Sequence, residues 1–221
     1  MLKHLIFLLI MASLPKDKIQ LVPIGKIEEE VLLYLKEELV KIFSLPTEVG
    51  QPMGMPKSSF NKRRNQYYSP FILRELEKRR SGEYIILGIC DLDLYVEGLN
   101  FIFGQADILN QVGIISLIRL KPEFYGKGRD EKLFYKRVLT EAVHELGHIF
   151  GLAHCPNPKC VMFFSNSILD TDRKGFNFCP LCYKKNYQVE GWKGLTNGHK
   201  NYRRRIIFLI SSSLSVFNRK K

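Results

Sequence analysis

The sequence predicts an α/β fold, in the broad sense that includes α+β, and three observations lead to this prediction. Short apolar runs bounded by Gly, Pro and polar residues alternate with segments whose apolar residues recur at helical spacing. The 221 residues are 45% hydrophobic and 25% charged, the composition of a soluble globular protein that can bury its own core. A long helix is expected from about residue 130, leading into a dense group of histidines and cysteines.

The first half of the chain is expected to contain a strand, two helices and a long loop. Residues 19–25 read as a strand ended by glycine, and residues 26–43 as a helix, since apolar residues recur four apart and glutamates come early. Residues 44–68 are rich in Pro, Gly, Ser and Asn, which predicts a loop carrying basic residues. Residues 71–80 are expected to form a short second helix.

Three further strands are predicted at residues 84–90, 101–103 and 112–120. Cys90 ends the first of these apolar runs. A free cysteine in such a run is expected to be a small core residue rather than a nucleophile.

The run HELGHIFGLAHC, beginning at His144, is the most informative motif of the chain. His144 and His148 are four residues apart, so on a helix they share one face and can bind one metal ion. Gly151 permits a turn with positive φ that brings in His154 as a third nitrogen ligand. Three protein ligands leave one position for water, as in catalytic zinc sites, and Glu145 beside the first ligand is the candidate general base.

This helix is expected to begin near Asp130 and Glu131, where negative charge suits the helix dipole.

Four of the five cysteines follow the histidines as one C-x4-C and one C-x2-C pair: Cys155, Cys160, Cys179 and Cys182. Two such pairs separated by a loop predict a closed tetrahedral zinc site of four thiolates, which would be structural. The alternative is two disulfides. A chain of this length can build a core without them, so we expect the second zinc ion and therefore two zinc ions per chain.

Met162 lies between the cysteine pairs, and on its own it would be read as a filler of the core. Together with HELGHIFGLAHC, C-x4-C, C-x-M and C-x2-C, it makes the chain resemble archaemetzincin, a branch of the metzincin zinc peptidases. The runs at residues 86–95, 100–106 and 115–126 are also similar to that family. The spacing from Met162 to Cys179 is about one residue shorter than the family pattern, in a segment expected to be a loop that tolerates deletion.

The resemblance implies a metzincin-like zinc peptidase fold: a twisted mixed sheet, a long active-site helix and a small C-terminal subdomain stapled by zinc. It implies that the three histidines hold the catalytic zinc, that Glu145 is the base and that Met162 packs beneath the metal. In metzincins the substrate backbone pairs with an edge strand, and residues 112–120 are the candidate here.

The resemblance covers about residues 19–187, which we expect to form one catalytic domain. Residues 1–18 would be an N-terminal extension, either a signal-like segment or the result of a wrongly assigned start, with Met11 as the preferred start. Zinc-bound thiolates fit a reducing compartment, so a cytoplasmic location is expected and secretion is disfavoured.

Residues 188–221 would be a basic C-terminal extension, with seven basic residues and no acid after residue 199. A poorly ordered terminus is preferred to a weak membrane-surface contact, and no run is long enough for a transmembrane segment.

The function expected is zinc-dependent hydrolysis of peptide bonds in a peptide or protein substrate, and an aminopeptidase is one form of it. The alternative is a binding module for peptides or nucleic acid that does not cleave. The net charge of +12 invites the nucleic-acid interpretation, but the basic residues are dispersed and no known module contains them, so no nucleic-acid partner is expected.

Overall fold

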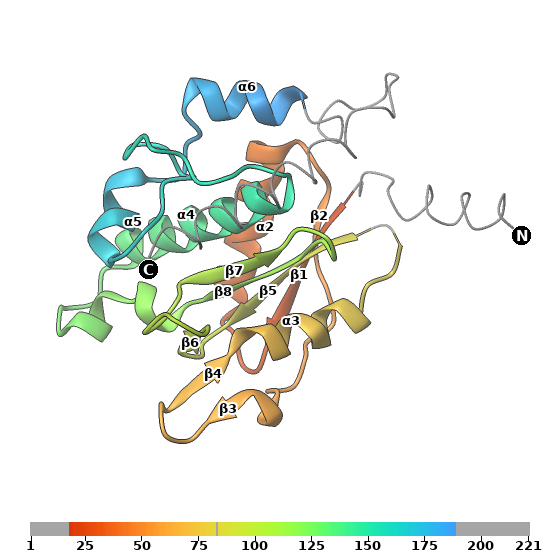
Figure 1. Ribbon diagram of the computed structural model, residues 1–221, viewed down its shortest axis with the longest axis vertical. Helices are drawn as coiled ribbons and strands as arrows, with labels where there is room; N and C mark the ends of the chain where they lie inside the picture. The colour runs from red at the N-terminus through yellow and green to blue at the C-terminus, as the bar shows by residue number, and fades with distance from the viewer. Residues whose placement is uncertain (1–17, 83, 189–221) are drawn as a thin grey trace, which may run out of the picture.

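The computed structural model describes residues 18–82 and 84–188, so the predictions for residues 1–17 and 189–221 lie outside the described residues. A five-stranded sheet in the order β2-β1-β5-β8-β7 forms the centre of the fold (Figure 1). Its strands are β1 (Lys18–Ile24), β2 (Thr47–Val49), β5 (Tyr84–Cys90), β7 (Gly104–Asp107) and β8 (Val112–Ser116). Four strands are parallel and β7 is antiparallel to β8, which confirms the mixed sheet.

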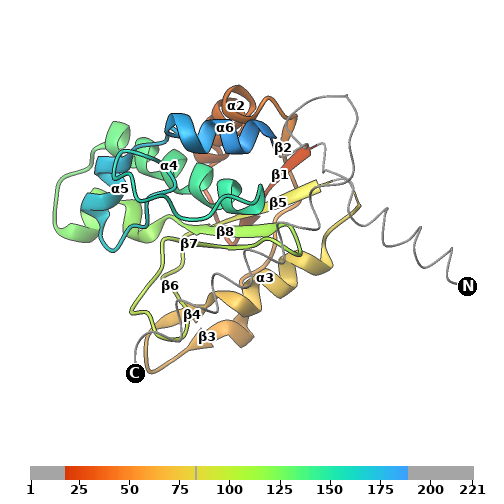
Figure 2. The same ribbon diagram turned by 45° about the horizontal axis from the view of Figure 1, so that its top comes forward.

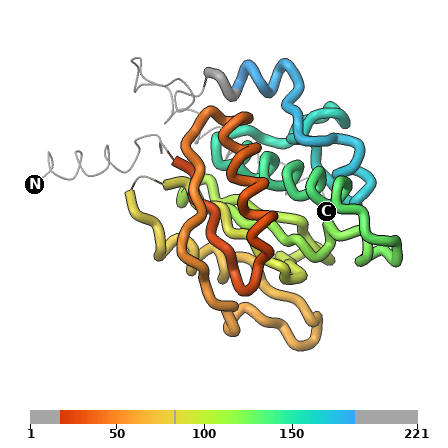
Figure 3. Tube along the Cα trace, turned by 180° about the vertical axis from the view of Figure 1, so that it is seen from behind, coloured from red at the N-terminus to blue at the C-terminus, as the bar shows by residue number. Residues whose placement is uncertain are grey.

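Helices cover both faces of this sheet, which explains why β5 is an uninterrupted apolar run. Helix α2 (Glu29–Phe43) packs against α4 (Glu131–Ile149) on one face, as seen from behind in Figure 3. Helix α3 (Ser69–Lys78) lies on the other face (Figure 2). Within the described residues, every helix is too short or too polar to cross a membrane.

Helix α4 begins where the sequence predicts. The Asp130 side chain accepts a hydrogen bond from the Leu133 amide at 2.9 Å, which satisfies one of the free N–H groups of the first turn. Glu131 adds negative charge there. The C-terminal half of the helix is almost entirely buried against the sheet.

The prediction of a loop over residues 44–68 is wrong in part. Besides β2, the segment contains a 3₁₀ turn, η1 (Lys57–Ser59), and the strands β3 (Phe60–Asn61) and β4 (Gln66–Tyr68). These strands form a small second sheet with β6 (Leu94–Tyr95). Because β4 pairs with a strand almost thirty residues away, local composition does not reveal it.

The predicted edge of the sheet is also wrong. Strand β8 lies between β5 and β7, and residues beyond it form a 3₁₀ turn, η2 (Ile118–Leu120). The strand predicted at residues 101–103 is reduced to a single bridge from Ile102 to Leu94, and the strand itself starts at Gly104. The edge next to α4 is therefore β7.

The C-terminal part adds structure that the sequence did not suggest. After a 3₁₀ turn, η3 (Pro122–Tyr125), and after α4, the chain forms α5 (Ile168–Lys174) and α6 (Pro180–Gln188). Helix α5 has a capping box in which Ser167 and Asp170 satisfy each other's backbone amides. The segment expected to be a loop is thus partly helical.

Candidate metal centres

The three histidines of the motif converge on one point. Nε2 of His148 lies 3.2 Å from Nε2 of His144 and 3.2 Å from Nε2 of His154. Ligand nitrogens at about 2.0 to 2.1 Å from a tetrahedral zinc are about 3.3 Å apart, so the donor set and its spacing fit this ion. His144 is buried, His148 is half-buried and His154 is exposed, which leaves one side of the cluster open.

Backbone carbonyls fix two of the rings. Nδ1 of His144 donates to the Val161 carbonyl at 2.7 Å, and Nδ1 of His148 donates to the Leu152 carbonyl at 2.7 Å. Each bond leaves the Nε2 lone pair directed at the common point. Burial, aided by the charge of Lys174, lowers the pKa of His144 well below its ordinary value, and burial lowers the pKa of His148 to about 4. Neutral imidazoles of this kind are the form that binds metal.

Gly151 has φ +87°, as the motif predicts. The Leu152 amide donates back to the Gly147 carbonyl at 2.9 Å, and this bond closes the end of α4 and turns the chain toward His154. A residue with a Cβ would be strained at this φ.

Glu145 is 4% exposed and faces the edge strand β7. Burial and the nearby Glu141 carboxylate raise the pKa of Glu145 well above its ordinary value, while Lys174 opposes the shift. A Cβ at Gly104 would lie 2.6 Å from Glu145 Oε1 and 2.7 Å from the Ile114 carbonyl oxygen, so glycine at this point of β7 leaves room for both the carboxylate and the neighbouring strand β8. Sequence reasoning missed Gly104, because its role depends on a contact between segments forty residues apart.

A buried ion pair, which sequence analysis did not anticipate, lies beside the histidines. Lys174 Nζ is 3.2 Å from Glu141 Oε1, and the side chains are 0% and 3% exposed. The Thr171 hydroxyl donates to the same Glu141 oxygen at 2.8 Å. Lys174 Nζ also lies 3.3 Å from His144 Nδ1. Helix α5 therefore supplies polar contacts to the C-terminal half of α4, next to the histidine cluster.

The four cysteines form a second cluster, with all four sulfurs within 4.8 Å of one another. Cys155 and Cys179 Sγ are 3.8 Å apart, which is too far for a disulfide and fits two thiolates on one tetrahedral zinc. Burial raises the pKa of Cys179, but hydrogen bonds from the Cys182 backbone and the neighbouring thiols outweigh it and lower the pKa to about 7.

Cys90 lies apart from this cluster in β5. Burial raises its pKa to about 12, as expected for an unreactive core thiol.

Met162 is fully buried directly below the helix that carries the histidines. A Cβ at Gly147, between His144 and His148, would overlap Met162 Sδ. The Met162 carbonyl also accepts the Cys155 amide at 2.9 Å. This placement fits the supporting position that the resemblance implies.

A mixed sheet crossed by a long helix whose H-E-x-x-H histidines converge with a third histidine defines the class of zinc-dependent metallopeptidases. The model of peptidase family M54 matches residues 29–188, and the chain belongs to this family.

Relatives and solved structures agree with this assignment. The archaemetzincin of Pyrococcus furiosus is 46% identical over 178 residues, which cover 77% of this chain and 92% of the relative. The crystal structure of archaemetzincin from Archaeoglobus fulgidus has a TM-score of 0.67 and 36% identity, and the match covers 76% of this chain and 99% of that one. A zinc-dependent peptidase from Methanocorpusculum labreanum has a TM-score of 0.70 and 30% identity with the same coverage.

Proposed function

We propose that this metallopeptidase binds its catalytic zinc through His144, His148 and His154 and uses Glu145 as the general base. The convergence of three Nε2 atoms beside one buried carboxylate is the observation that carries this proposal. The four cysteines would hold a second, structural zinc ion.

A zinc ion at the histidines would lower the pKa of a bound water toward about 7 and polarise the peptide carbonyl. Glu145 would take the proton of the attacking water on its carboxylate and pass it to the leaving amine nitrogen. Gly104 keeps the space that the carboxylate needs.

The backbone of an extended peptide would pair with the edge of β7 that no other strand covers within residues 18–82 and 84–188. This strand is the last of its sheet, and its first residue lies against Glu145. Backbone groups of an edge strand hold a peptide in register without selecting its side chains. The arrangement fits cleavage within a chain and at its end equally, so an aminopeptidase stays one form of the proposal.

Cleavage of a diverse peptide mixture by the zinc-loaded protein, read by mass spectrometry beside Glu145→Ala and the isosteric Glu145→Gln, tests the proposal. We expect products from the wild type alone, with unchanged zinc content in both variants. The positions of the cuts would separate an endopeptidase from an aminopeptidase. Equal cleavage by the variants would refute the role of Glu145, and no cleavage by any of the proteins would favour the non-catalytic binding module.

A further inference from the structure

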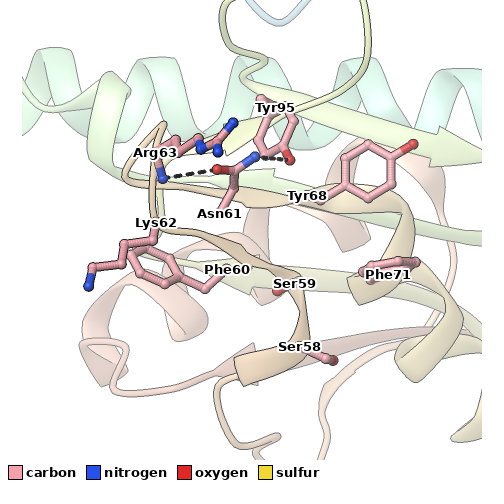
Figure 4. A pocket seen from close by; sticks show the side chains of 9 residues that line it. All are labelled: Ser58, Ser59, Phe60, Asn61, Lys62, Arg63, Tyr68, Phe71 and Tyr95. Carbon is pink, nitrogen blue, oxygen red and sulfur yellow. Dashed lines mark hydrogen bonds between the residues drawn. The ribbon is translucent and has the colours of Figure 1, made fainter.

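A second recess lies on the small sheet, outside the zinc site. It is a shallow pocket of about 360 Å³ between η1, β3, β4, β6 and the start of α3 (Figure 4). We call it the β3–β6 pocket. Two basic and four aromatic residues dominate its lining: Phe60, Lys62, Arg63, Tyr68, Phe71 and Tyr95.

The aromatic wall of the pocket is held in place by neighbouring contacts. The Tyr68 ring packs at 5.3 Å against both the Phe71 and the Tyr95 ring. Asn61 Nδ2 donates to the Tyr95 hydroxyl at 3.0 Å (Figure 4). The Arg64 guanidinium stacks 4.3 Å from the centre of the Tyr95 ring. A surface fixed in this way loses little entropy when a ligand binds.

The charge of the pocket has one sign. Lys62 and Arg63 are exposed, no acidic residue lines the pocket, and neither residue forms an ion pair within the part of the chain that the structure describes. Arg119, by contrast, is neutralised by Asp93 at 2.6 Å. Two unpaired cations beside aromatic rings suit a ligand that offers carboxylates together with an apolar or aromatic group.

The pocket is connected to the edge strand on which the proposed substrate would lie. The Ser69 hydroxyl contacts the Tyr95 carbonyl at 3.2 Å and the side chain of Gln105, in β7, at 2.6 Å. Ile102, two residues before Gly104, bridges to Leu94, the neighbour of Tyr95. These contacts place β6, whose Tyr95 lines the pocket, beside the segment that leads into β7.

We propose that the β3–β6 pocket binds an acidic segment of the peptide substrate, outside the residues that pair with β7. This inference rests on the proposed function. The preference for acidic segments comes from Lys62 and Arg63, and the aromatic wall takes an adjacent apolar side chain.

Binding without turnover tests the pocket. The probe is a fluorescein-labelled peptide with four glutamates beside one phenylalanine, and its counterpart has four glutamines. Fluorescence anisotropy with the Glu145→Ala protein at low salt should show tighter binding of the glutamate peptide. Adding Lys62→Gln and Arg63→Gln should weaken that binding about fivefold, and about 0.5 M salt should remove most of the difference.

A matched control separates the pocket from general attraction by a basic protein. Lys36→Gln with Lys132→Gln removes the same charge from exposed positions of α2 and α4, on the other face of the sheet. We expect this pair to leave binding unchanged. When Glu145 is left intact, the changes at Lys62 and Arg63 should raise the KM for a cleavable acidic peptide without changing its kcat. They should also leave the KM for the corresponding glutamine peptide unchanged.

Two results would overturn the inference. The first is equal binding of the glutamate peptide by the pocket variant and the control variant. The second is displacement of the probe by single-stranded RNA at a lower concentration than unlabelled glutamate peptide requires. The second result would assign the surface to nucleic acid. Because binding is measured without cleavage, these failures are separate from a failure of the catalytic proposal, which would appear as intact binding with no products.

Discussion

Replacement of Lys174 by methionine should strongly destabilise the fold. Methionine keeps most of the side-chain volume but removes the cation. Among the residues that the structure describes, the buried Glu141 carboxylate then retains only the Thr171 hydroxyl as a partner. Breaking a buried pair by removing one partner costs about 3 to 5 kcal/mol. Domains are stable by only about 5 to 15 kcal/mol, so this loss corresponds to a fall in Tm of roughly 6 to 20 °C.

Urea unfolding of the zinc-loaded proteins measures this loss. The double variant Lys174→Met with Glu141→Gln removes both charges and should recover most of the stability. Lys78→Met is the matched control, because Lys78 pairs with Glu75 at 2.6 Å but both side chains are exposed. It should change the free energy of unfolding very little. A Lys174→Met protein within about 1 kcal/mol of the wild type, or a double variant no more stable than the single one, would refute the reasoning.

Three further predictions concern the two candidate metal centres. Gly104→Ala places a Cβ 2.6 Å from Glu145 Oε1 and should lower kcat about tenfold to a hundredfold with zinc content unchanged; an unaltered kcat would contradict the contact. Cys179→Ser should halve the zinc measured by elemental analysis and lower Tm, and full retention of both would exclude a four-cysteine site. In metal-free protein, burial lowers the pKa of His148 to about 4. Between about pH 6.5 and 4 this histidine is therefore protonated in the unfolded chain but neutral in the folded protein, so the free energy of unfolding decreases as the pH falls through that window. The loss of stability due to His148 across this window is on the order of 3 kcal/mol. It is measured as the difference in unfolding free energy between the wild type and His148→Gln at each pH, and a difference that does not change with pH would refute the prediction.

The features that the sequence predicts correctly depend on local pattern. Helix α2 shows apolar residues at four-residue spacing on its buried side, and β5 is a continuous apolar run. The HELGHIFGLAHC motif places its donors through helix geometry and one glycine turn, so the structure brings the three histidines together as expected. Such features need no knowledge of distant contacts.

The features that were missed depend on distant contacts. Strand β7 reads Gly-Gln-Ala-Asp, which has no strand propensity, and it exists because it pairs with β8. Arg137 looks like a surface residue of a helix, yet it is 2% exposed because Asp172, thirty-five residues later, pairs with it at 2.7 Å. The pattern of apolar residues cannot predict a buried charge, because it assigns every charged residue to the surface.

The two candidate metal centres share a short stretch of backbone, which links the C-terminal part of the chain to the histidine site. Cys160 belongs to the cysteine cluster, the next carbonyl, of Val161, accepts the Nδ1 proton of His144, and Met162 then packs below Gly147. The Met162 carbonyl accepts a hydrogen bond from the backbone amide of Cys155, another member of the cysteine cluster. A metal ion held by the cysteines would fix both ends of this stretch, and with it the tautomer and the orientation of His144. The cysteine cluster would therefore help to position the histidine site, in addition to stabilising the C-terminal part of the fold.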